Sequence, residues 1–127
     1  MAGAGGTALA IAAIRGGGIG SLPCALLKPD EVIEQAATVR AAAKGPINLN
    51  FFCHTLGDPP DDSAWQEILA PYYAEYGASY PANPPSLRAR FDMAMAEVVA
   101  QVKPEIVSFH FGLPDVALPD SVRTSAT

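Results

Sequence analysis

A histidine near the end of an apolar run is the strongest candidate for chemistry in this sequence. His110 lies in Glu105–Pro114, a short segment rich in β-branched and aromatic residues that Gly and Pro terminate, which is typical of a buried parallel strand. Ser108 lies two residues earlier, so both side chains point to the same side of the strand. His110 could contact a ligand at the strand end, or it could be a histidine satisfied within a barrel core.

A second apolar run carries two asparagines in the same alternating pattern. Asn48 and Asn50 share one face of an expected strand, Ile47–Phe52, and apolar side chains share the other. Polar groups toward the carboxyl ends of two buried strands are typical of an α/β protein that binds its ligands at its strand ends. We therefore expect Asn50 and His110 to open on one side of a sheet, near its C-terminal edge.

The elements that must position these side chains alternate between helices and strands. Apolar residues at helical spacing and residues that favour helix ends predict three helices, over Thr7–Arg15, Lys28–Ala43 and Ser86–Val102. The expected strands are Ile19–Leu22, Ile47–Phe52 and Ile106–Phe111. Right-handed crossovers predict that these strands are parallel neighbours in that order, with the last two helices covering one face.

Residues 55–85 break this rhythm. The segment is rich in proline and contains all four tyrosines, and it is much longer than an ordinary connection of ~2–6 residues. A short helix is expected over Ala64–Leu69, capped by Asp62 or Ser63 and kinked or ended by Pro71. The segment could be an aromatic-rich insertion that packs on itself, or a lid over a ligand.

Composition and charge exclude several classes of protein. The chain has 127 residues, of which 50% are hydrophobic, enough for one domain with a sizeable core. The net charge of -5, without a cluster of Lys and Arg, argues against a nucleic-acid partner. No apolar run approaches the ~20 residues that cross a bilayer, so no membrane partner is expected. Cys24 and Cys53 do not form a disulfide framework and are expected to be reduced thiols of a cytoplasmic protein.

Two further motifs match known site patterns only weakly. Gly3–Ala8 fits the glycine pattern of dinucleotide-binding loops, but the pattern requires a preceding strand and none is present. A glycine loop that leads into a helix could still offer N–H groups to an anion. Cys53 and His54 adjoin a strand end without further ligands at metal-binding spacing, so we expect no metal site.

Four segments together resemble the nitronate monooxygenase family, also called 2-nitropropane dioxygenases. They follow one another in the family's order: Met1–Gly3, Gly17–Pro23, Asn48–Phe52 and Val107–Gly112. The resemblance runs from Met1 to about Asp115. It implies an α/β fold, the (β/α)8 TIM barrel, with FMN as cofactor.

The resemblance also implies which residues contact the cofactor. Met1, Ala2 and Gly3 resemble the end of a first-strand motif whose backbone lies against the flavin ring, and Asn50 falls where the family's asparagine contacts FMN. With His110 at its strand end, these five are the expected cofactor-binding residues. The family's catalytic histidine would lie outside this sequence, so the catalytic residue stays unassigned.

The length is awkward for this resemblance, because a full barrel takes roughly 250 residues. We expect a partial TIM barrel with about strands two to four and their helices. It would be a single domain over residues 1–127, with the insertion at about 55–85. The first strand and everything after the fourth would be missing, as in a truncated chain.

The implied activity is the oxidation of alkyl nitronates with O₂ by a cytoplasmic FMN oxidoreductase. The 127-residue chain by itself is expected to be inactive and to associate with itself through open sheet edges. Two alternatives remain open: a non-enzymatic fragment without a cofactor, and a relative of the flavin-dependent enoyl reductases. A yellow colour of the purified protein with FMN would separate the flavoproteins from the non-enzyme.

Overall fold

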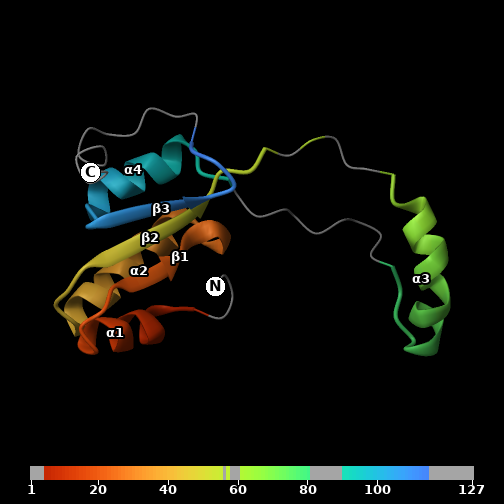
Figure 1. Ribbon diagram of the computed structural model, residues 1–127, viewed down its shortest axis with the longest axis horizontal. Coiled ribbons are helices and arrows are strands. Elements are labelled where there is room, and N and C mark those ends of the chain that lie inside the picture. Colours follow the sequence, from red (N-terminus) through yellow and green to blue (C-terminus); the bar gives the residue numbers. More distant parts are fainter. Residues whose placement is uncertain (1–4, 56, 58–60, 81–89, 115–127) are drawn as a thin grey trace. The chain divides into compact units, whose positions relative to one another are not determined.

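The computed structural model describes residues 5–55, 57, 61–80 and 90–114. Its elements are, in chain order, α1 (Thr7–Arg15), β1 (Gly20–Pro23), the short 3₁₀ helix η1 (Cys24–Leu26), α2 (Pro29–Ala42), β2 (Ile47–Phe52), α3 (Ser63–Glu75), α4 (Met93–Val102) and β3 (Ile106–His110) (Figure 1). The chain divides into two compact units. One contains the sheet with α1, α2 and α4, and the other is the segment Thr55–Leu87 with α3.

The three strands form one parallel sheet in the order β1-β2-β3, so the predicted topology is confirmed (Figure 1). In the register, Ser21 lies opposite Asn48 and Asn50 lies opposite Ser108. The first strand begins at Gly20, one residue later than predicted, and Ile19 is exposed. Each strand is joined to the next through a helix that packs on the sheet, as expected of βαβ units.

One face of the sheet forms the core with α1, α2 and α4, as predicted for α2 and α4. The alternating burial of β2 places Ile47, Leu49 and Phe51 on this face, each almost completely buried. The remaining buried members of the cluster come from the neighbouring elements and include Leu22, Ala10, Ile14, Val32, Ala36, Val39, Met95, Val98 and Val99. Apolar spacing in the sequence indicates Ile33, Ala36, Ala37 and Arg40 as the inner face of α2, and this prediction is partly wrong. Val32 and Val39 are buried with Ala36, whereas Ala37 and Arg40 are exposed.

A glycine allows α1 to approach the first strand closely. A Cβ atom at Gly20 would lie 2.9 Å from the Ala10 carbonyl oxygen and 2.7 Å from the Cδ1 atom of Ile14. Real Cβ atoms do not come this close to backbone, so any side chain at this position would push helix and strand apart.

The helix before β3 begins later than predicted. It starts at Met93, and Asp92 caps it, with Oδ1 accepting a hydrogen bond from the Met95 N–H at 2.9 Å. Ser86, the predicted cap, lies outside the described residues. The N–H of Phe91 donates to the Phe52 carbonyl at 2.8 Å, at the end of β2. Because Phe91 bonds to the strand, the helix begins only after this residue. Similarly, Gly6 and not Thr7 is the N-cap of α1.

Pro71 neither ends nor interrupts α3, which runs from Ser63 to Glu75. Proline removes one main-chain donor, so the Glu67 carbonyl loses its helical partner. No residue of α3 is buried, and Glu67 itself is exposed, so water can take the place of that donor. The prediction that Pro71 would end the helix was therefore wrong, and a kink at Pro71 stays a prediction.

The segment around α3 makes its hydrogen bonds and ring contacts internally. The Tyr80 hydroxyl donates to Asp62 Oδ2 at 2.7 Å, and the rings of Tyr73 and Tyr80 lie 5.5 Å apart. Trp65 on α3 is 65% exposed, and Ile68 and Tyr72 on the helix and Tyr76 directly after it are also exposed. These contacts agree with an aromatic insertion that packs on itself, and a role as a lid stays a prediction.

A polar clip joins α2 to the starts of β2 and β3. The Glu105 carboxylate accepts from the Ile47 N–H at 2.9 Å and from Arg40 Nη1 at 3.2 Å. Arg40 Nη2 also donates at 3.0 Å to the carbonyl of Lys103, the left-handed residue that ends α4. Burial alone would raise the pKa of Glu105, but these donors outweigh it and hold the pKa below its ordinary value.

Candidate functional site

The face of the sheet that the helices leave open carries a row of polar side chains, which we call the amide–hydroxyl ladder: Ser21, Asn48, Ser108 and Asn50. Asn48 Nδ2 donates to Ser21 Oγ at 2.9 Å and to Ser108 Oγ at 3.0 Å. Asn50 Nδ2 donates to the same Ser108 Oγ at 2.8 Å. The ladder therefore crosses all three strands, because the parallel register brings one member of each strand side by side.

The ladder contains one unsatisfied atom. Asn48 Oδ1 is buried and has no hydrogen-bond partner among the described residues. A buried carbonyl without a donor costs roughly 1–3 kcal/mol, so such an atom usually receives a hydrogen bond from water, a ligand or another part of the chain. Asn48 Oδ1 is thus an acceptor that no donor within the described residues satisfies.

Aromatic side chains gather beyond the ladder, at the carboxyl ends of β2 and β3. The ring of Phe52 lies 5.1 Å from that of Phe111, 6.0 Å from that of His110 and 6.2 Å from that of His54. The ring of His54 completes the group, 6.4 Å from Phe111 and perpendicular to it. Phe111 is 69% exposed and has a positive φ of 66°, a backbone conformation that is uncommon for a bulky residue. The strand ends therefore present a rim of accessible ring surfaces.

Two of the five predicted site residues lie on the same face of the sheet. Asn50 and His110 do share the open face, because Asn50 lies opposite Ser108 and His110 lies two residues further, opposite Phe52. Both are near the C-terminal edge, as expected. Met1, Ala2 and Gly3 lie outside the described residues. That any of the five contacts a cofactor stays a prediction.

Sequence reasoning missed three participants on this face. Ser21 joins the ladder although its segment looked like a minimal strand, and Phe52 and Phe111 contribute most of the aromatic rim. The alternation that placed Asn48 and Asn50 together also places Phe52 with them, so this residue was within reach of the same pattern. The contribution of Ser21 could not be predicted, because it depends on the pairing of β1 with β2, which no local sequence pattern encodes.

The two cysteines and the histidines do not form a metal site. No group of three or more His, Cys, Asp and Glu side chains gathers within the described part of the chain. Burial raises the pKa of the Cys24 thiol to about 12, against a smaller opposing effect of a hydrogen bond with the Asn50 main chain. The Cys24 thiol is therefore neutral at pH 7 and is a poor nucleophile or ligand.

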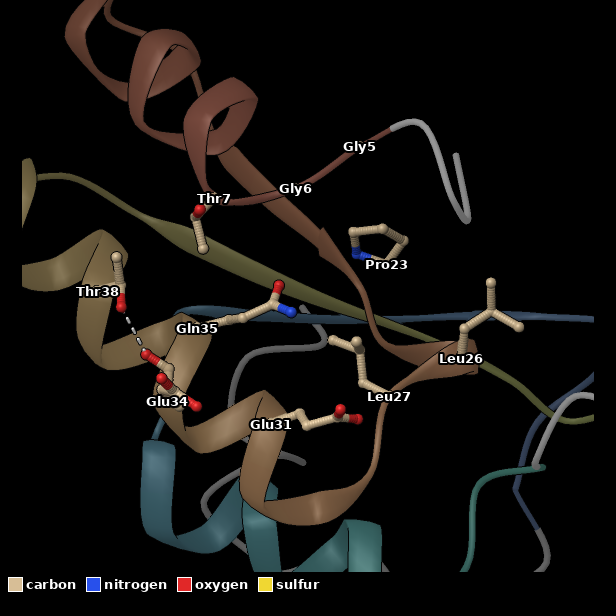
Figure 2. Close-up of a pocket in the computed structure, with 10 residues that line it drawn as sticks. All are labelled: Gly5, Gly6, Thr7, Pro23, Leu26, Leu27, Glu31, Glu34, Gln35 and Thr38. Atoms are coloured by element: carbon tan, nitrogen blue, oxygen red, sulfur yellow. Dashed lines mark hydrogen bonds between the residues drawn. The ribbon is translucent and has the colours of Figure 1, made fainter.

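A separate hollow of about 600 Å³ lies between the start of α1, the turn after β1 and one side of α2 (Figure 2). Ten residues line it: Gly5, Gly6, Thr7, Pro23, Leu26, Leu27, Glu31, Glu34, Gln35 and Thr38. Glu31 Oε2 accepts from the Lys28 N–H at 2.6 Å and so helps to cap α2. The two carboxylates on the wall oppose an anion, so the glycine loop before α1 gains no support as a phosphate site.

No helix in the described ranges is long and apolar enough to cross a membrane.

Comparison with known proteins gives one consistent family. The sequence profile described as nitronate monooxygenase matches residues 1–126. A nitronate monooxygenase of Paraburkholderia phytofirmans is 40% identical over 118 residues, which are 90% of this chain and 32% of that protein. A nitronate monooxygenase of Pseudomonas aeruginosa is 34% identical over 111 residues, 84% of this chain and 32% of that protein.

The solved structures add the fold. Nitroalkane oxidase from Streptomyces ansochromogenes superimposes with a TM-score of 0.77 and 26% identity, over 100% of this chain and 36% of that one. The three-stranded parallel sheet with its helices is thus part of a TIM barrel, as predicted from the sequence. The chain spans about a third of the length of the curated relatives that it matches.

Proposed function

Because this chain belongs to the nitronate monooxygenase family, we propose that it supplies the flavin-facing part of a barrel that oxidises alkyl nitronates with FMN and O₂. The observation that carries the proposal is the pairing of the amide–hydroxyl ladder with the aromatic rim on the open face of the sheet. In TIM barrels the ligands bind at the carboxyl ends of the strands, which is where this rim lies.

The residues on this face fit a flavin. An isoalloxazine is a flat ring system with one apolar edge and one edge rich in hydrogen-bonding atoms, and its ribityl chain carries hydroxyls. The rim offers ring surfaces for the apolar part, led by Phe52 and Phe111. The ladder offers amide and hydroxyl groups for the polar part, among them the amide of Asn50, which lies nearest to the carboxyl ends of the strands.

The chain's own residues would bind and orient the cofactor. When bound, FMN supplies the redox chemistry, taking electrons from the nitronate and passing them to O₂. Asn50 would hold the polar edge of the flavin, and the rim of Phe52, His54 and Phe111 would exclude water from one side of it. His110 is exposed at the end of β3 and would contact the cofactor or substrate, while the proton-abstracting histidine would lie outside this chain, as the resemblance to the family implies.

A chimera tests this function directly. In it, the chain would replace the matching 32% of the Paraburkholderia relative. We expect the chimera to bind FMN, to consume O₂ with a nitronate, and to lose at least tenfold in FMN affinity on Asn50→Ala. Gln101→Ala, on an exposed position of α4, is the matched control and should change neither property. A folded but colourless chimera would favour the fragment without a cofactor, and FMN binding with turnover of an enoyl substrate instead would favour the enoyl reductase relatives.

The 127-residue chain alone should bind FMN weakly and should not oxidise nitronates. General-base catalysis is commonly worth ~10²–10⁴-fold, and the histidine that the family uses for it lies outside this sequence. Oxygen uptake by residues 1–127 with excess FMN and a nitronate measures this. Clear uptake that Asn50→Ala abolishes would show that this part of the barrel is sufficient.

Self-association and location belong to the same proposal. Within the described residues β1 and β3 each pair only with β2, so both outer edges of the sheet offer unpaired main-chain groups. Sedimentation should show association of residues 1–127 that grows with protein concentration, and a monomer at all concentrations would contradict it. Two cysteines outside any disulfide agree with a reducing compartment such as the cytoplasm.

A further inference from the structure

The contacts of Asn50 define which end of its amide remains for a ligand. Asn50 Nδ2 lies 2.8 Å from Ser108 Oγ and 3.4 Å from the Ser108 main-chain carbonyl oxygen. A main-chain carbonyl can only accept hydrogen bonds, so the amide atom that faces it must be the nitrogen. Both hydrogens of Nδ2 are then directed at Ser108, and Oδ1 is the end that faces away from it.

Ser108 is itself held in place from two sides. The sheet register sets it directly opposite Asn50, so their distance follows from strand pairing and not from two flexible side chains. Its hydroxyl oxygen also accepts from Asn48 Nδ2 at 3.0 Å, and Asn48 in turn donates to Ser21. A hydroxyl that receives two amide donors in this way is anchored by all three strands.

We propose that Ser108 is a positioning residue that locks the Asn50 amide with its carbonyl oxygen outward, so that Asn50 serves the ligand as a hydrogen-bond acceptor. The contacting ligand atom must then carry an N–H or O–H group. FMN offers both kinds, the imide N–H of its ring and the hydroxyls of its ribityl chain. This part of the inference rests on the proposed function, whereas the locking of Asn50 does not.

The first experiment measures the locking without any ligand. In the ¹⁵N-labelled 127-residue chain, the order parameter of the Asn50 side-chain amide is compared between the wild type and three variants. Ser108→Ala should turn a rigid amide into a mobile one, from about 0.8 to below about 0.6. Ser108→Thr keeps the hydroxyl and should restore order. Thr38→Val removes a hydroxyl that donates to the Glu34 carbonyl on α2 and should leave the Asn50 amide rigid.

The outcome decides the proposal in either direction. An Asn50 amide that is equally rigid in Ser108→Ala and in the wild type overturns it. If Ser108→Ala fails to fold, the comparison of Ser108→Thr with Ser108→Cys takes its place, because the thiol has similar size and is a weak acceptor. Order retained in Ser108→Cys would then overturn the proposal, and order lost would support it.

The second experiment measures what the locking does for the ligand. FMN is titrated to millimolar concentration while the amide signals of the open face are followed, which detects weak binding. Ser108→Ala should raise the dissociation constant about three- to tenfold. If Ser108 acts through Asn50, the double variant with Asn50→Ala should bind no worse than Asn50→Ala alone. Additive losses would mean that Ser108 contacts the ligand itself and would overturn the positioning role.

Two further measurements extend this experiment. The first identifies which group of FMN donates to Asn50, and the second distinguishes failure of the proposed flavin function from failure of the role of Ser108. With FMN methylated at the imide nitrogen, disappearance of the Asn50→Ala effect identifies the imide N–H as the donor, and persistence identifies a ribityl hydroxyl. An Asn50→Ala effect that is absent with both flavins overturns the acceptor role. If FMN perturbs no signal at all, the proposed flavin function fails in this chain, and the ligand-free measurement still decides whether Ser108 locks Asn50.

Discussion

The two faces of the sheet carry the same strands and opposite chemistry. On β2, Leu49 is completely buried against the helices, while its neighbours Asn48 and Asn50 lie half-buried on the open face and both donate to the Ser108 hydroxyl. The helix-covered face is closed by apolar contacts within the chain. The open face instead contains a hydrogen-bond ladder with an acceptor, Asn48 Oδ1, that has no partner among the described residues. Alternate residues of one strand thus serve the core and the face to which we assign the proposed binding site.

Adjacent substitutions on β2 test this division most severely. Leu49→Ala should lower the free energy of unfolding by about 2–5 kcal/mol, because it leaves a cavity at a site with 0% exposure. Asn48→Ala removes two hydrogen bonds but also removes the buried unsatisfied Oδ1, so it should cost only about 1 kcal/mol. Urea denaturation followed by far-UV circular dichroism measures both. Equal losses would mean that the two faces do not differ as described.

The close packing of α1 on β1 gives a second test of the helix-covered face. Gly20→Ala places a methyl group against the Ala10 carbonyl and the Ile14 side chain, and should cost about 1–3 kcal/mol. Gly57→Ala is the matched control, because nothing lies within 4 Å of a Cβ atom there. Thermal melts of the two variants give the comparison. An unchanged melting temperature for Gly20→Ala would show that the helix can move away freely.

The clip at the start of β2 and β3 should give a smaller, pH-dependent effect. The pKa of Glu105 is lowered in the folded chain, so its contribution is present above its unfolded pKa of about 4.3 and is lost as the pH falls through the folded value. Glu105→Gln should destabilise by less than about 1 kcal/mol at pH 7, because both partners are partly exposed.

The destabilisation by Glu105→Gln should shrink as the pH falls below the unfolded pKa, and it should vanish once the pH has passed the lowered folded pKa and the native carboxyl is protonated. Unfolding free energies between pH 3 and 7 measure this, and Glu97→Gln at an exposed position of α4 is the control. A difference from the native chain that stays constant with pH would assign the effect to packing and not to charge.

The sequence predicted the parts of the fold that local patterns encode. Apolar runs of β-branched and aromatic residues located β2 and β3 within one residue, and the order of strands followed from crossover handedness. The start of α4 was misplaced because the Phe91 N–H bonds to Phe52, a contact between residues far apart in sequence. Pro71 was misjudged because its cost depends on solvent access to the Glu67 carbonyl, which propensity does not contain.

The candidate site was predictable only as a face, and not as a network. Alternation placed Asn48 with Asn50 and Ser108 with His110, each on its own strand. Which serine meets which asparagine depends on register, since a slip by one residue turns every side chain to the other face. The shared Ser108 hydroxyl and the contribution of Ser21 could therefore be seen only once the strands were paired.

The contact between Arg40 and Glu105 also closes a loop, because it joins residues 65 positions apart. The segment Thr55–Leu87 lies inside that loop. The entropy of closing a flexible loop grows only with the logarithm of its length, so doubling the loop costs roughly 0.6 kcal/mol. Lengthening or shortening the segment by several residues would therefore hardly change how readily the barrel strands meet. The length of this segment can therefore change without a large effect on the stability of the sheet.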